Sequence, residues 1–286
     1  MFAPILHALL WTVATSAADP NQARDEAAAE ASGLREERSL TQSPGPLAVY
    51  VKEKDAWNAP VLQVAGRFAE VGREIFGDDL PLVRLFLVSD RGDLESFTRA
   101  TLGRAREQGT GTFHLAVICL KCERRPVGKP ETTAVVLHEC GHAWLNTYLR
   151  DHYRLDYLSP AIRRPFLDEG IADFIANRWD ADFLARRRTW MSTEKVARGV
   201  PPPALEDLNT YAPFYEQGDR NVHYWFSALL VERMLGSPTG APRRILKYLD
   251  EMGSGASPEE AWERATGKSI RTEYDALVAE LWGRRK

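Results

Sequence analysis

The sequence is poor in cysteine, carries no excess of basic charge and has no long hydrophobic run. Its 286 residues include 3 cysteines and have a formal net charge of −3. Basic clusters are short and fit solvated helix faces, so we expect no nucleic-acid partner. The apolar run at residues 5–13 is too short for a transmembrane helix, which needs about twenty apolar residues. Apolar residues make up 44% of the chain and charged residues 27%, which is typical of a globular protein with an ample core.

The first eighteen residues contain no Asp, Glu, Lys or Arg, and their apolar run ends in small residues. This pattern predicts a secretory signal peptide over residues 1–18, cut after Ala17 or Ala18, and export to the periplasm or the extracellular space. The alternative is a short buried N-terminal helix, because a signal peptide usually opens with basic residues. Residues 19–46 mix Ala, Glu, Arg and Ser and end in Ser-Pro-Gly-Pro. A loose helix over residues 24–38 is conceivable, but the apolar positions there make no persistent stripe, so we expect a flexible linker to a folded domain over residues 47–286.

Cys119 and Cys122 have C-x-x-C spacing, which suits a redox pair, half of a zinc site or a local disulfide. No second C-x-x-C completes a four-thiolate zinc site. A Pro/Gly-containing loop at residues 126–130 follows, where a thioredoxin-type centre would have a helix. The sequence therefore favours a local disulfide or an incidental pair over redox catalysis. Cys140 is expected to be a small packed residue.

The hydrophobic pattern changes along the chain from mixed strand and helix to helix alone. Apolar runs predict strands at residues 47–51, 82–88 and 112–120, and amphipathic spacing predicts helices at residues 56–76 and 94–102. From Thr132 the pattern is helical almost to the end, and Thr132 or Thr133 can cap the first of these helices. We expect an α+β fold, with a small mixed sheet and helices in residues 47–131 and a mainly helical half in residues 132–286.

The strongest functional signal is the pentad His138-Glu139-Cys140-Gly141-His142 in the first of these later helices. Histidines four residues apart lie on one helical face, so both imidazoles can reach one cation. Zn²⁺ is the usual occupant of such a pair, and the intervening Glu139 can take a proton from a water molecule at the metal.

A tetrahedral zinc needs a further ligand, and the best candidate is Glu169, which follows His142 after 26 intervening residues. That gap allows a turn and an antiparallel return to the site. Asp173 lies four residues beyond Glu169, on the same helical face. A carboxylate there can accept the outer N–H of a ligating histidine and orient its ring. Two histidines, one glutamate and an open position are typical of catalytic rather than structural zinc.

His-Glu-x-x-His followed by Glu-Gly-x-Ala-Asp-Phe resembles the gluzincin metallopeptidases, the class of thermolysin and the relatives of aminopeptidase N. The sequence is most similar to bacterial peptidase-MA-like domains, with Phe166 and Phe174 at two positions where that pattern has other aromatic residues. The resemblance covers roughly residues 117–281 and is strongest at the two metal motifs. It implies a zincin-like fold, one zinc ion and a peptide or protein substrate.

Carried over by motif, the resemblance assigns zinc binding to His138, His142 and Glu169. It assigns general-base and then general-acid catalysis to Glu139, and support of a ligating histidine, His138, to Asp173. It also implies a side chain that donates a hydrogen bond to the oxyanion of the tetrahedral intermediate. Tyr224 matches by position in the helical tail, and its neighbour His223 is the alternative, because a histidine has this role in thermolysin. Packing in the core is the non-catalytic alternative for Tyr224.

The sequence thus predicts a zinc metallopeptidase that hydrolyses peptide bonds. One alternative is a metal-binding scaffold of the same fold that has lost activity. A second is a thiol-disulfide enzyme centred on Cys119 and Cys122, for which no other feature of the sequence argues. The amine-recognition motif Gly-x-Met-Glu-Asn is absent, which argues mildly against an aminopeptidase.

Overall fold

A computed structural model describes residues 20–36 and 47–283, apart from residues 53, 107, 158, 160, 218, 237 and 238. The signal peptide expected at residues 1–18 lies outside the described residues. Within them the fold is mixed α+β and mostly helical, as expected from the sequence. None of the described helices is long and apolar enough to cross a membrane.

A five-stranded mixed sheet forms the first half of the fold. Its strands are β1 (Arg35–Glu36), β2 (Leu47–Val51), β3 (Val83–Leu87), β4 (Thr110–Thr112) and β5 (Leu115–Ile118), in the spatial order β1-β2-β3-β5-β4. The central strands β2, β3 and β5 are parallel, whereas β1 and β4 pair antiparallel at the two edges. Every residue of β3 and β5 is buried, as in parallel strands that are covered by helices on both faces.

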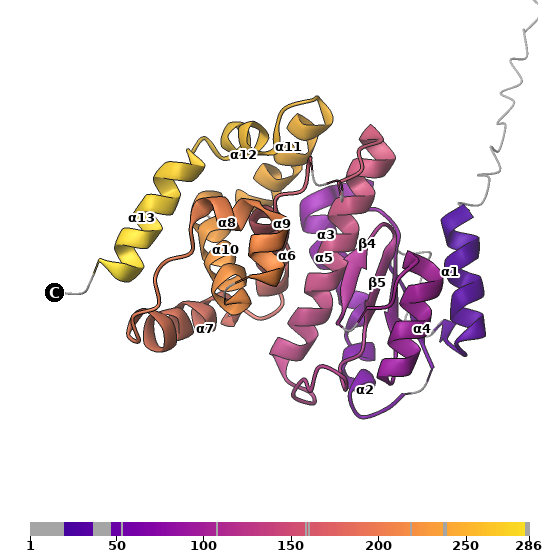
Figure 1. Ribbon diagram of the computed structural model, residues 1–286. Helices are drawn as coiled ribbons and strands as arrows, with labels where there is room; N and C mark the ends of the chain where they lie inside the picture. Colours follow the sequence, from indigo (N-terminus) through magenta and orange to yellow (C-terminus); the bar gives the residue numbers. More distant parts are fainter. Residues whose placement is uncertain are drawn as a thin grey trace, which may run out of the picture.

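The helices before the metal motif cover the two faces of this sheet, and the later helices form the second half (Figure 1). In chain order, the helices of the described residues are α1 (Pro20–Ala31), α2 (Asn58–Leu62), α3 (Phe68–Phe76), α4 (Arg91–Leu102), α5 (Pro130–Tyr153), α6 (Pro165–Asn177), α7 (Phe183–Trp190), α8 (Leu205–Asn209), α9 (Tyr211–Glu216), α10 (Arg220–Leu235), α11 (Ala241–Gly253), α12 (Pro258–Thr266) and α13 (Ile270–Trp282). A π-helical turn, Met191–Val196, continues α7.

Alternate residues of β3 pack into two separate hydrophobic clusters, one on each face of the sheet. Leu85 and Leu87 point to the side of α3 and α5, where they join a large cluster that contains Trp144 and extends into the helical half. Phe86 points to the other side and packs with Phe97 of α4. Helix α5 therefore lies between the sheet and the later helices, as Figure 1 shows, and carries its motif at the junction of the two halves.

The prediction of a flexible linker over residues 19–46 is wrong for residues 20–36. Helix α1 packs through Ala28 and Ala29 on the Phe86 side of the sheet, and β1 pairs with β2. Asp25 and Arg84 are both buried and form an ion pair at 2.8 Å between Oδ2 and Nη2. The sequence did not show this because alanines make only a faint apolar stripe and the partner of Asp25 is 59 residues away. Residues 37–46 of the expected linker lie outside the described part.

Helix α5 begins slightly earlier than expected, with Pro130 in its first turn, where a missing N–H costs nothing. Lys129 occupies the N-cap position without a side-chain cap, so neither Thr132 nor Thr133 caps the helix. Thr132 instead donates its hydroxyl to the Pro126 carbonyl at 2.6 Å. The helix ends at Tyr153, and the C-cap residue Arg154 adopts a left-handed backbone conformation with φ of 60°.

Candidate metal centre

Three glycines let the elements around the pentad approach closely. A Cβ on Gly111 of β4 would lie 1.9 Å from the Glu139 carbonyl oxygen, so this edge strand passes directly over the backbone of α5. A Cβ on Gly141 would lie 3.1 Å from Ile175 of α6, and one on Gly170 of α6 would lie 2.8 Å from the Ser227 carbonyl of α10. The pentad is therefore enclosed by β4 on one side and by α6, backed by α10, on the other.

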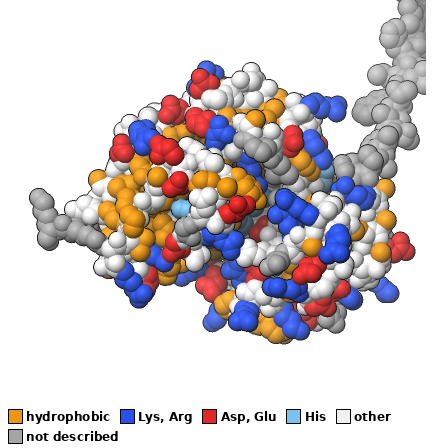
Figure 2. All heavy atoms as spheres, viewed as in Figure 1, with side chains coloured by type: hydrophobic (Ala, Val, Ile, Leu, Met, Phe, Trp, Pro, Cys, Tyr) orange, Lys and Arg blue, Asp and Glu red, His pale blue; other side chains and the backbone are white. Residues whose placement is uncertain are grey.

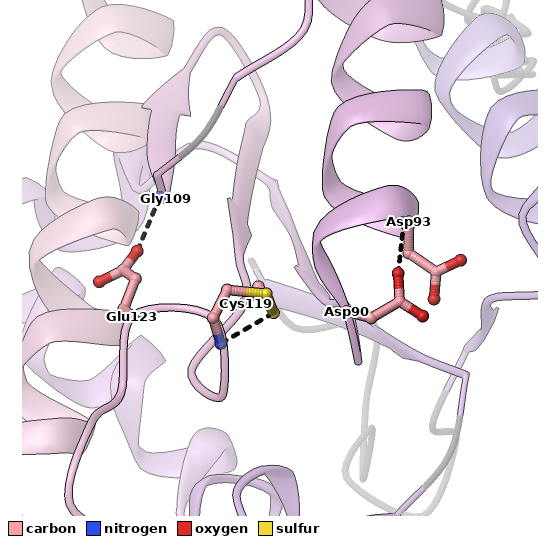
Figure 3. Close-up of a disulfide and its surroundings, with 6 residues drawn as sticks. Asp90, Asp93, Gly109, Cys119 and Glu123 are labelled. Carbon is pink, nitrogen blue, oxygen red and sulfur yellow. Dashed lines mark hydrogen bonds between the residues drawn. A yellow bond between two sulfur atoms is a disulfide. The ribbon is translucent and has the colours of Figure 1, made fainter.

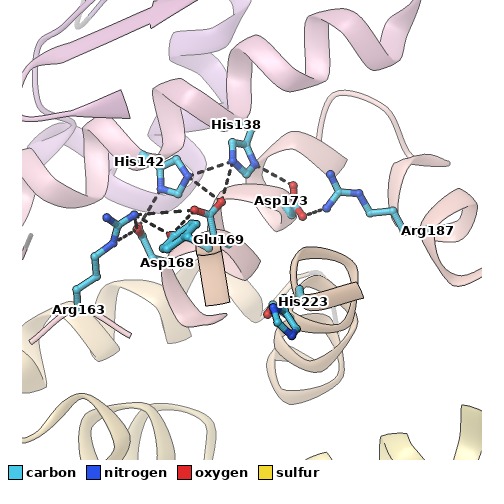
Figure 4. A network of polar contacts seen from close by, with 10 residues as sticks. His138, His142, Arg163, Asp168, Glu169, Asp173, Arg187 and His223 are labelled. Atoms are coloured by element: carbon cyan, nitrogen blue, oxygen red, sulfur yellow. Dashed lines mark hydrogen bonds and ion pairs between the residues drawn. The ribbon is translucent and has the colours of Figure 1, made fainter. Parts of the chain in front are cut away.

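The structure brings His138, His142 and Glu169 together, with one ligand atom from each directed to a common point (Figure 4). The two histidine Nε2 atoms are 3.0 Å apart, and Glu169 Oε2 is 3.3 Å from each of them. All three residues are buried. This group could hold a metal ion, as the sequence predicted.

Each histidine is held from behind by its own carboxylate. Asp173 Oδ1 is 2.8 Å from His138 Nδ1, which is the contact expected from the sequence. Asp168 Oδ1 is 2.8 Å from His142 Nδ1, a contact that the sequence analysis missed. A carboxylate at Nδ1 fixes that proton and leaves the Nε2 lone pair for a metal. The adjacency of Asp168 to Glu169 was the available signal, because both lie in the first turns of α6.

A second ring of side chains holds these carboxylates in place. Tyr215 donates its hydroxyl to Glu169 Oε1 at 2.6 Å. Arg163 donates from Nε to Asp168 Oδ2 at 2.8 Å and from Nη2 to the Tyr215 hydroxyl at 3.0 Å. Arg187 of α7 forms an ion pair with Asp173. No helical or strand period connects these three residues to the pentad, so the sequence could not indicate their contacts.

The contacts between rings and carboxylates determine the charge of the site. Burial alone would raise the pKa of Glu169, but the imidazoles of His142 and His138 hold it well below its usual range. The pKa of Asp168 is lowered against burial by His142 and Arg163. Burial would lower the pKa of His142, yet Asp168 and Glu169 raise it well above its usual value. Without a metal, the site thus keeps Asp168 and Glu169 charged and favours a proton on His142.

The site holds more negative than positive groups, and a divalent cation would balance the difference. The ionisable groups of the site are the carboxylates of Glu139, Asp168, Glu169 and Asp173 and the guanidinium groups of Arg163 and Arg187. With neutral histidines, four negative groups face two positive groups, and a charge of about +2 balances them. The site therefore suits a divalent metal on charge as well as on geometry.

Glu139 lies between the two histidines in sequence and beside them in space. Its carboxyl has a raised pKa because of burial, which outweighs the opposing effect of His138 and His142. A carboxylate with a raised pKa is a stronger base than a free one. Its position on α5 agrees with the role that the resemblance implies.

The two candidates for an oxyanion donor differ in their surroundings. His223 is buried, its Nδ1 lies 3.0 Å from the Phe214 carbonyl oxygen, and Figure 4 shows it apart from the contact network of the other labelled residues. Tyr224 is half-buried, and its ring lies 6.0 Å from that of Tyr215. Burial, followed by the negative charges of Glu169 and Glu139, raises the pKa of Tyr224. Of the two residues, Tyr224 therefore lies within electrostatic reach of the site, with its proton firmly held.

Cys119 and Cys122 form a disulfide at the end of β5, with a Cα–Cα distance of 5.2 Å (Figure 3). The loop that follows is tied back to the residue directly before β4, because Glu123 accepts a hydrogen bond from the Gly109 backbone N–H at 2.8 Å. Cys140 is a free buried thiol whose pKa is raised by burial. It packs in the core, as the sequence predicted.

Comparison with known proteins gives no family for this chain. No protein-family model matches the sequence, and no curated protein matches it. The functional interpretation therefore depends on the chemistry of the residues that the fold brings together.

Proposed function

We propose that this chain is an exported, zinc-dependent metallopeptidase of the gluzincin type with a zincin-like fold. The observation that carries the proposal is the convergence of His138 Nε2, His142 Nε2 and Glu169 Oε2, while carboxylates hold the outer nitrogen of both rings. Support for the fold comes from the mixed sheet, the motif-bearing α5 and the helical half, in the order that the resemblance implies. Export rests on the sequence pattern of residues 1–18.

The donor set fits zinc better than harder divalent cations. Zinc binds imidazole nitrogen and carboxylate oxygen at about 2.0–2.1 Å in tetrahedral geometry, which places neighbouring ligand atoms about 3.3 Å apart. The observed separations of 3.0, 3.3 and 3.3 Å agree with that value. Magnesium and calcium prefer sites made of oxygen ligands. Three protein ligands also leave the fourth position open, as a catalytic site requires.

Each residue of the site then has its own role in peptide hydrolysis. When bound, zinc would polarise the carbonyl of the cleaved bond and lower the pKa of a water molecule. Glu139 accepts the proton of the attacking water and delivers it to the departing amine nitrogen. Tyr224 donates its phenolic hydrogen to the developing oxyanion, which its high pKa permits. Asp168 and Asp173 keep the two rings oriented throughout.

The test is a cleavage profile of the zinc-loaded protein on a quenched peptide library. We expect Glu139→Gln to bind zinc like the wild type and to lose at least about a hundredfold in kcat, because general acid–base catalysis contributes about 10²–10⁴. Glu131→Gln, in the first turn of the same helix, is the matched control and should keep full activity.

Two outcomes would contradict the proposal. Cleavage by Glu139→Gln at the wild-type rate would disprove the role of that residue. Stoichiometric zinc without hydrolysis of any peptide would favour the inactive scaffold of the same fold. An insulin-reduction assay addresses the thiol-disulfide alternative, for which Cys119 and Cys122 would need to cycle between disulfide and thiols.

A further inference from the structure

The two carboxylate oxygens of Glu169 have different surroundings. Oε2 lies 3.3 Å from the Nε2 atoms of both His138 and His142. Oε1 instead accepts the hydroxyl hydrogen of Tyr215 at 2.6 Å. Because Glu169 is buried, water does not readily take the place of that hydrogen bond. One oxygen is thus available to a metal ion, whereas the other is already engaged by a tyrosine.

The direction of this hydrogen bond is fixed by Arg163. Its Nη2 donates to the Tyr215 oxygen at 3.0 Å, and a guanidinium group has no acceptor, so the phenolic hydrogen is left for Glu169. Arg163 is itself held by Asp168, whose Oδ2 lies 2.8 Å from Nε. Figure 4 shows Arg163 at the opposite end of this contact network from Arg187. Tyr215 therefore faces the metal ligand as a donor.

The ring of Tyr215 is held as well as its hydroxyl. Its centre lies 4.8 Å from that of Phe214 and 6.0 Å from that of Tyr224 on α10. The Arg163 Cζ atom lies 5.4 Å from the centre of the same ring. These contacts limit the movement of the phenol, so Glu169 has to keep its orientation in order to keep the hydrogen bond.

The orientation of Glu169 matters because a carboxylate can bind a metal ion through one oxygen or through both. With both oxygens, the site would offer four protein ligand atoms, which is the number that fills a tetrahedral zinc site. No position would then remain for the water molecule that attacks the substrate. Figure 2 shows that the surface is hollowed between the two halves of the molecule, so a substrate can approach their junction, from which the ligands come.

We propose that Tyr215, directed by Arg163, is a positioning residue that restricts Glu169 to binding the metal through Oε2 alone and so keeps the fourth position open. The hydroxyl of Tyr215 is committed to Glu169 and is not available to the substrate, so Tyr224 keeps the role of oxyanion donor. This inference deepens the proposed function and rests on it for the presence of the metal. The open position can be measured without any cleavage.

The experiment loads the full chain with cobalt(II), whose visible spectrum reports the ligands of the metal, and titrates it with azide, an anion that binds a metal at an open position. We expect Tyr215→Phe to bind azide about tenfold more weakly than the wild type, because Oε1 without its charge-assisted hydrogen bond competes for that position. Cobalt itself should bind at least as tightly, since Glu169 then offers two oxygens. A residue that only supports the fold would give the opposite pattern, with weaker cobalt binding and an unchanged affinity for azide.

Tyr211→Phe is the matched control. It removes the same hydroxyl from an exposed residue one turn earlier on α9, and it should leave both affinities unchanged. An affinity of Tyr215→Phe for azide equal to that of the wild type, or a loss of its cobalt binding, overturns the inference. A wild type that binds no cobalt overturns the inference and the proposed function together. If azide binding weakens as expected but the zinc-loaded wild type cleaves no peptide, the role of Tyr215 stands and the peptidase is refuted.

Discussion

The carboxylates behind the two histidines of the site have different ion-pair and hydrogen-bond partners. Asp173 is paired with Arg187 from α7, whereas Asp168 is paired with Arg163, which also reaches Tyr215 and through it Glu169. Loss of the Asp168 carboxylate therefore frees His142 and leaves Arg163 without its main partner. Asp168 is consequently the residue whose loss disturbs two ligands at once.

Asp168→Asn should weaken zinc binding by about 10–100-fold, the usual cost of losing a hydrogen-bond partner behind a ligating histidine. Competition with a chromogenic chelator measures this affinity directly. Asp182→Asn, an exposed acidic residue before α7, serves as the control and should bind zinc like the wild type. An affinity of Asp168→Asn within about twofold of the wild type would mean that Asp168 does not orient His142.

At this scale the sequence predicted the residues that lie at helical spacing from one another. Glu169 and Asp173 share a face of α6, so a period of 3.6 residues was enough to connect them. Tyr215 lies 46 residues after Glu169 and reaches it only because α9 packs against α6. Its contact depends on tertiary packing, which has no periodic signature in the sequence.

The edge strand β4 contributes no ligand but passes very close to the ligand-bearing helix α5. Its Gly111 occupies a position in which any side chain would collide with the backbone of α5 at Glu139 and with the Cβ of His142, 2.7 Å away. Because the obstacle is backbone in a buried helix, the conflict cannot be relieved by rotating a side chain. The separation between β4 and α5, and with it the position of Glu139, depends on this glycine.

Gly111→Ala should lower the free energy of unfolding by about 1–3 kcal/mol, the range for an overpacked site, and should reduce kcat together with stability. Chemical denaturation of the zinc-loaded protein measures the change. Gly92→Ala is the control: this glycine lies in the first turn of α4, and its added Cβ would meet only the Asp90 side chain at 3.3 Å. We expect its free energy of unfolding to stay the same or to rise slightly. Equal stability of Gly111→Ala and the wild type would show that β4 moves freely relative to α5.

Two elements show where the sequence pattern was insufficient. The helix expected at residues 56–76 is divided into α2 and α3 by a 3₁₀ turn, Ala65–Arg67. Val61, Leu62, Ala65 and Phe68 are nevertheless all buried, so the apolar pattern continues across the break. The strand expected at residues 112–120 is a hairpin, because His114 takes a left-handed conformation with φ of 53° between β4 and β5. A single non-glycine residue at positive φ leaves no mark in the hydrophobic pattern.

At the scale of the whole molecule, the ligands come from the junction of the two halves. His138 and His142 belong to α5, which packs against the sheet, and Glu169 belongs to α6, which packs against α10 in the helical half. The change from mixed pattern to helical pattern was visible in the sequence, because the periods of strands and helices differ. The docking of α1 through Asp25 and Arg84 was not visible, because it depends on one contact between distant residues.

A metal ion at this junction would connect the two halves, so zinc should stabilise the molecule as a whole. At free zinc about a hundredfold above Kd, the stabilisation is about 2.7 kcal/mol. That corresponds to a rise in Tm of about 5–10 °C for a domain of this size. Glu169→Gln removes the ligand from the second half and should lose most of this rise. Differential scanning calorimetry with and without a chelator measures it.

The size of this rise should depend on pH in a defined direction. Asp168 and Glu169 raise the pKa of His142 in the metal-free site, so zinc must displace a proton there in order to bind. As pH increases from 6 to 8, fewer protons compete, the affinity for zinc increases and the difference in Tm between loaded and metal-free protein becomes larger. In Asp168→Asn the proton is held less tightly, so the dependence on pH should become weaker. A rise in Tm that is the same at pH 6 and pH 8 would contradict competition between the proton and the metal for His142.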